Sequence, residues 1–186
     1  MSELGRSYLA ETIAGLRALE AQASKAIAQV EDADLFRQLD PEANSIAVLM
    51  RHVAGNARSR FTDFLASDGE KPTRDRDAEF ESPPIATRVA LLEEWRAGWR
   101  CVFDAVEALR PEDLAAVVRI RGESRSVVSA LEAAKRHYAT HVGQIVLLAK
   151  HWRGAQWQTL SIPKRGREAG ASGLRENTSN VSREGR

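Results

Sequence analysis

The segment from Val127 to Trp152 constrains the fold most, because it carries an unbroken hydrophobic seam of helical period. Its seam residues recur at alternating steps of four and three: Val127, Leu131, Ala134, Tyr138, His141, Ile145, Leu148 and Trp152. Such spacing places one stripe along a helix, and helix bundles bury stripes of this kind. The segment therefore predicts a long helix packed against other helices.

Three earlier segments carry the same helical pattern, so the chain is expected to be all-α. The first has its stripe at Leu9, Ile13, Leu16, Ala23, Ile27 and Val30. The second is expected from a cap at Asn44-Ser45 to Ser67-Asp68-Gly69, with Ile46, Leu49, Val53, Ala57, Phe61 and Phe64 inside. The third is expected from a Ser82-Pro83-Pro84 start to Leu109, with Ile85, Val89, Leu92, Trp95, Trp99, Val102, Phe103 and Val106 inside.

Residues 114–125 break this pattern, and Val117, Val118 and Ile120 beside Arg121-Gly122-Glu123 predict a short hairpin-like connection before the last helix. The expected fold is an all-α four-helix bundle spanning residues 1–160. Residues 161–186 are rich in Gly, Ser and Arg and nearly devoid of apolar residues. We expect this polar, basic tail to be disordered.

Charge and composition exclude several functional classes. The net charge of +1 gives no reason to expect nucleic acid or an acidic membrane surface as a partner. No apolar run is long enough to span a bilayer, and the first residues lack the pattern of a secretory signal. A single cysteine, Cys101, excludes an intramolecular disulfide. A cytoplasmic protein is therefore expected.

Three of the four histidines lie where core residues are expected. His137 and His141 are one helical turn apart, so their imidazoles share a side of the last helix. His52 lies beside the apolar stripe of the second helix and can face them. Bundles build metal sites in this way. The alternative is that these are packed histidines with ordinary hydrogen-bond partners; His151 is expected at the surface.

The segments around these histidines resemble the DinB-like superfamily of small bacterial metalloproteins, within a branch of conserved but uncharacterised proteins. The similarity covers residues 7–163. It rests on NSIAVLMRHVAGN, RSRFTDFLASDGEKPTRDRDAEF, HYATHVGQIVLLAKHW and LSIPK, and it ends after LSIPK. It implies a four-helix bundle in which His52, His137 and His141 hold one divalent ion, commonly nickel or zinc.

The superfamily includes thiol-dependent enzymes, which suggests a low-molecular-weight thiol and a small electrophile as substrates. Three neutral ligands leave a metal ion with an open position for chemistry. Asn56 and Arg60 follow His52 at helical spacing, and Arg60 is a candidate for holding a substrate carboxylate. Gln144 is a candidate for supporting a ligand. No catalytic residue is evident.

Three functions therefore remain open at this point. The chain is a metal-dependent transferase or hydrolase, a non-catalytic metal-binding or stress-related protein, or a helical scaffold with packed histidines. The wide apolar arc of Leu91, Leu92, Trp95, Trp99, Val102 and Phe103 also suggests a homodimer, with Cys101 packed and unreactive.

Overall fold

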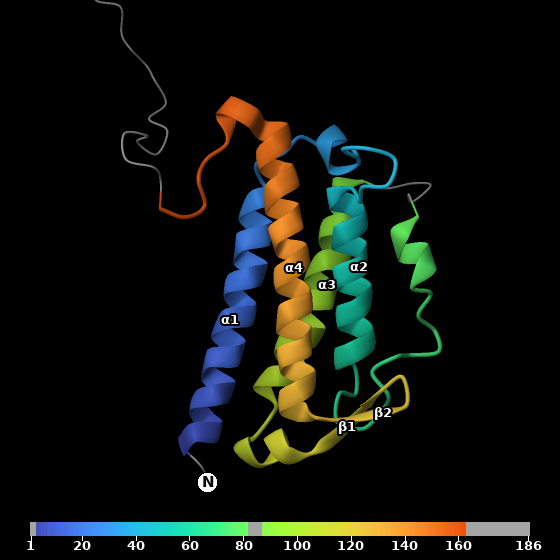
Figure 1. Cartoon of the computed structure of the whole chain (residues 1–186), viewed down its shortest axis with the longest axis vertical. Coiled ribbons are helices and arrows are strands. Elements are labelled where there is room, and N and C mark those ends of the chain that lie inside the picture. Colours follow the sequence, from blue (N-terminus) through green and yellow to red (C-terminus); the bar gives the residue numbers. More distant parts are fainter. Residues whose placement is uncertain (1–2, 82–86, 163–186) are drawn as a thin grey trace, which may run out of the picture.

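The computed structural model describes residues 3–81 and 87–162, which form a bundle of four long helices with a small hairpin at one end (Figure 1). The helices are α1 (Glu3–Ile27), α2 (Ile46–Phe61), α3 (Arg88–Glu107) and α4 (Val127–Arg153). The antiparallel hairpin pairs β1 (Val117–Ile120) with β2 (Glu123–Ser126). Short 3-10 helices are η1 (Ala33–Leu35), η2 (Asp77–Phe80), η3 (Pro111–Ala115) and η4 (Gly154–Gln156). The predicted all-α bundle and hairpin connection are confirmed.

The long connection between α2 and α3 allows these two helices to run in the same direction. α1 and α4 run one way along the bundle, and α2 and α3 run the other way (Figure 1). α1 packs mainly on α4, and α2 packs mainly on α3. Because α2 and α3 are parallel, the chain after α2 returns along the outside of that helix and carries η2 against it. This returning segment contributes a residue to the site between α2 and α4.

Local capping explains where α2 and α4 begin. Ser45 accepts a hydrogen bond from the backbone N–H of Val48 at 3.2 Å, and Ser126 accepts one from that of Ser129 at 3.1 Å. Both serines satisfy donors that a helix start leaves open. At the hairpin tip, Arg121 and Gly122 both have positive φ angles, as a two-residue turn of this kind requires. These starts match the sequence expectation.

The expected end of the second helix is wrong, and the third helix has its observed start at a threonine cap. α2 ends at Phe61 rather than at Ser67–Gly69, because Thr62 has an extended backbone and the chain then turns. α3 begins at Arg88, where the Thr87 side chain caps the helix, so Val89 is exposed in the first turn. The expected start at Ser82-Pro83-Pro84 lies outside the described residues, as does all of the predicted tail beyond Ile162.

The core lies between the four helices and is mostly aliphatic, with aromatic side chains as its largest members. Trp95, Trp99 and Tyr138 are almost fully buried, and the Trp99 ring contacts the Tyr138 ring. With Leu91 and Val102 they already pack within the chain, so they offer no surface to a second subunit. The homodimer remains a prediction. Among the described helices, none has a stretch both long and apolar enough to cross a membrane.

Gly98 sets how closely α3 approaches α2. A Cβ atom at this position would lie 2.6 Å from the Ala54 Cα atom, a distance that side-chain rotation cannot relieve. We expect Gly98→Ala to reduce the free energy of unfolding by about 1–3 kcal/mol, because the two helices would have to separate. Urea denaturation measures this change.

Gly15→Ala is the matched control, because a Cβ atom there meets nothing within 4 Å. This substitution should stabilise helix α1 by about 0.5–1 kcal/mol. If Gly98→Ala leaves the free energy of unfolding unchanged or raises it, as Gly15→Ala should, α3 does not approach α2 closely at Gly98.

Candidate metal centre

His52, His137 and His141 meet at one point between α2 and α4. One ring nitrogen from each lies within 4.8 Å of the other two. The three ring centroids are 4.6–5.1 Å apart, and the rings are nearly perpendicular to one another. α4 contributes His137 and His141 from adjacent turns, and α2 contributes His52, as the helical spacing predicts. Within the described part of the chain, this is the one group of such residues with the spacing of a metal site.

Two of the rings are oriented by hydrogen bonds through their Nδ1 atoms. His52 Nδ1 lies 2.9 Å from a carboxylate oxygen of Glu79, and His141 Nδ1 lies 2.7 Å from the Gln144 side-chain oxygen. Both oxygens are acceptors, so each Nδ1 atom carries the hydrogen. The Nε2 atom of each ring is then the one with a free lone pair for a metal ion.

His137 is the strongest test of whether this cluster suits a metal ion. Its Nε2 atom is buried and has no hydrogen-bond partner among the described residues. A buried polar nitrogen without a partner costs about 1–3 kcal/mol. A cation held jointly with the other two rings would satisfy this nitrogen, so the residues present fit a three-histidine site.

The charge state of the rings also suits metal binding. The pKa of His137 is lowered to about 4, first by burial and then by the neighbouring His141 and His52, with smaller effects from Arg74 and Arg60. Burial likewise lowers the pKa of His141, against the opposing hydrogen bond to Gln144. Both rings are therefore neutral at pH 7, and the neutral imidazole is the form that binds metals.

Glu79 is held in place by an arginine as well as by His52. Arg74, itself almost fully buried, donates from Nε to Glu79 Oε1 and from Nη2 to Oε2, both at 2.8 Å. Burial alone would raise the pKa of Glu79, but the hydrogen bonds from His52 and Arg74 outweigh it and lower the pKa. The carboxylate therefore stays ionised and accepts the His52 hydrogen.

Gly55 makes room for this carboxylate on α2. A Cβ atom at Gly55 would lie 2.1 Å from Glu79 Oε1. The close approach lets η2 lie against α2 at the level of His52. The returning segment between α2 and α3 thus supplies a supporting residue to a site built on helices.

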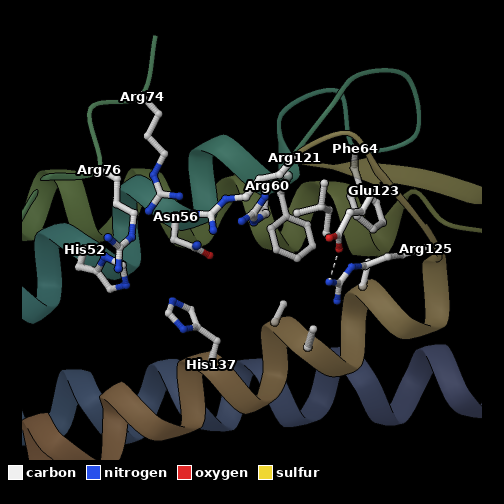
Figure 2. Close-up of a pocket in the computed structure, with 15 residues that line it drawn as sticks. His52, Asn56, Arg60, Phe64, Arg74, Arg76, Arg121, Glu123, Arg125 and His137 are labelled. Carbon is white, nitrogen blue, oxygen red and sulfur yellow. Dashed lines mark hydrogen bonds and ion pairs between the residues drawn. The ribbon is translucent and has the colours of Figure 1, made fainter. Parts of the chain in front are cut away.

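A cavity of about 490 Å³ extends from the histidines toward the hairpin. His52 and His137 lie at one end of it, and Glu123 and Arg125 of the hairpin lie at the other (Figure 2). Asn56 and Arg60 project from α2 into the space between them (Figure 2). Such a cavity is large enough for a small molecule next to the three rings.

Three other residues predicted from the sequence lie in or beside this site, whereas His151 and Cys101 lie outside the histidine cluster. Asn56 and Arg60 share the cavity with His52, and Gln144 bonds to His141. His151 is exposed, as expected, and is not part of the cluster. Cys101 is a half-buried residue of α3 and is not part of it either.

Sequence reasoning missed Glu79 and Arg74, because both lie in what looked like a polar loop. The pairing of Glu79 with His52 spans 27 positions, and no helical spacing reveals it. One signal was present, since both residues lie in the segment RSRFTDFLASDGEKPTRDRDAEF that carries part of the resemblance.

Comparison with known proteins gives one family. Residues 3–166 match the model of a family described as "Protein of unknown function (DUF1572)". No curated protein matches the chain. The matched residues include all four helices, the hairpin and the three histidines. The chain therefore belongs to the DUF1572 family.

Proposed function

We propose that this chain is a DinB-like metalloprotein that binds one divalent ion through the Nε2 atoms of His52, His137 and His141. The observation that carries this proposal is the convergence of the three rings on one point, with the buried Nε2 atom of His137 lacking any other partner among the described residues. Imidazole ligands suit nickel and zinc, the two ions that we expect. The alternative of a helical scaffold with merely packed histidines provides no partner for that nitrogen among the described residues.

We further propose that the bound ion serves an enzyme, either a thiol-dependent transferase or a hydrolase acting on a small electrophile. A divalent ion with an open position acts as a Lewis acid and lowers the pKa of a thiol or water bound to it. The cavity beside His52 and His137 favours an enzyme over a storage protein, because a closed structural site needs no adjoining space.

The chain's own residues have separate roles in this proposal. Glu79 and Gln144 keep the His52 and His141 rings in the tautomer that presents Nε2 to the ion. Asn56 and Arg60 supply hydrogen-bond donors to a molecule in the cavity. The alternative, a non-catalytic metal-binding or stress-related protein, is separated by turnover assays of thiol transfer and ester hydrolysis with the metal-loaded protein.

The first test of metal binding is elemental analysis of protein purified without a histidine tag. We expect about one equivalent of nickel or zinc per chain. His141→Ala should abolish binding by removing one of three ligands, whereas His151→Ala should retain it because His151 is exposed and outside the cluster. Wild-type protein that cannot be loaded, or equal loss in both variants, would contradict the proposal.

A second prediction concerns the support of His52 by Glu79. We expect Glu79→Gln to weaken metal binding about 10- to 100-fold, because the substitution removes the negative charge that His52 and Arg74 share. Gly55→Ala should act in the same direction by displacing the carboxylate. Competition with a chelator of known affinity measures both changes.

Glu123→Gln provides the control for this second prediction. Glu123 also lines the cavity and also pairs with an arginine, Arg125 at 3.0 Å, but it lies on the hairpin away from the rings. Its substitution should leave metal affinity unchanged. If folded Glu79→Gln binds metal as tightly as the wild type, Glu79 only packs against His52.

A further inference from the structure

Arginine is the most frequent residue type lining the cavity beside the three histidines. Five of its lining residues are arginines, namely Arg60, Arg74, Arg76, Arg121 and Arg125. The carboxylates paired with them are Glu70, Glu79 and Glu123, apart from a weak contact of Arg76 with Asp77 at the surface. Positive charge is therefore in excess around the cavity, even before a metal ion is counted. This excess favours an anionic occupant.

Arg60 differs from the other four arginines in having a buried guanidinium nitrogen without a hydrogen-bond partner among the described residues. Arg74 is engaged by Glu79 and Glu70, and Arg125 by Glu123. Arg60 has a single contact, from Nη2 to Glu70 at 3.2 Å, and its buried Nη1 has no partner among the described residues. Burial also lowers the pKa of Arg60, so an anion beside it would offset the cost of its desolvation.

Asn56 provides a second donor one helical turn from Arg60. Its side-chain oxygen accepts a hydrogen bond from the Tyr138 hydroxyl at 3.2 Å, which fixes the amide. The amide nitrogen has no hydrogen-bond partner within the described residues, and Asn56 lines the cavity (Figure 2). His52, Asn56 and Arg60 thus follow one another at four-residue steps along one face of α2.

The opposite wall of the cavity is apolar and built from small side chains. Ala130, Ala133 and Ala134 precede His137 on α4 and leave space where larger residues would fill the gap. Phe61, Phe64 and Ile120 add apolar surface. An occupant with a short hydrocarbon body therefore has a matching surface between the metal end and Arg60.

From these observations we infer that the cavity binds a small carboxylic acid with a short apolar body, its carboxylate held by Arg60 and Asn56 and its reactive end at the three histidines. The position of the reactive end rests on the metal site proposed above. Two donor side chains one turn apart match the two oxygens of a carboxylate. His52 and Arg60 are about 12 Å apart along the helix axis, so the length of the acid is restricted.

The first test does not depend on the metal. Binding of butyrate and of butanol to the full chain is followed by NMR titration. We expect butyrate to bind more tightly, and Arg60→Gln to weaken butyrate binding about 10- to 100-fold while leaving butanol unaffected. Arg100→Gln, at an exposed position on α3, is the control and should change neither. Equal binding of butyrate by wild type and folded Arg60→Gln would overturn the inference.

The second test asks whether one molecule contacts both the metal ion and Arg60. Cobalt-loaded protein is titrated with straight-chain mercapto acids of increasing length and with the matching mercapto alcohols, and thiolate-to-cobalt absorption reports binding. We expect the acids to bind more tightly at one intermediate length, and this preference to disappear in Arg60→Gln at unchanged cobalt content. A preference that survives in Arg60→Gln would place the carboxylate elsewhere and overturn the inference.

The two proposals fail separately in these tests. Butyrate binding that depends on Arg60, in protein that takes up no cobalt, would refute the metal site alone. Cobalt uptake without any preference for acids would refute the carboxylate site alone.

If Arg60→Gln does not fold, Ala133→Leu replaces it, because its larger side chain, on the helix opposite Arg60, fills the cavity. Ala139→Leu, exposed on the same helix, is its control, and equal binding by both variants would overturn the inference.

Discussion

The contact between the Glu79 carboxylate and the His52 ring ties the returning segment to the helix bundle. Removing a carboxylate from water costs several kcal/mol unless charged partners and hydrogen bonds compensate. Here Arg74 provides both, His52 provides a third donor, and Gly55 provides the space. Each of these partners would be costly to bury alone. The position of the segment and the orientation of the ring are therefore fixed together.

The direction of α3 explains why a connection takes part in the site at all. A short loop after α2 would place α3 antiparallel to it and leave the outer face of α2 open. The parallel arrangement instead brings the chain back along that face (Figure 1). On its way, Glu70 pairs with Arg60, Arg74 and Arg121, which links the segment to α2 and to the hairpin. Arginines of this charged network and residues of α4 line the cavity.

The arginines around the cavity also act on the histidines. Positive charge nearby disfavours protonation of an imidazole, and Arg74 and Arg60 add to the burial that lowers the pKa of His137. The same charges attract an anion. The same arginines therefore help to keep His137 unprotonated, which is the form that binds a metal ion, and make the adjoining space suitable for a negatively charged molecule.

The sequence by itself determined the elements with local causes: four amphipathic helices, a capped start of α2 at Asn44-Ser45, the hairpin, and the helical spacing that brings His137 and His141 together. It placed the end of α2 wrongly, because the extended backbone at Thr62 ends the helix although the apolar pattern continues. Only the tertiary structure revealed Glu79, Arg74 and the unsatisfied nitrogen of His137. These depend on contacts between distant segments, and periodicity within one helix carries no information about such contacts.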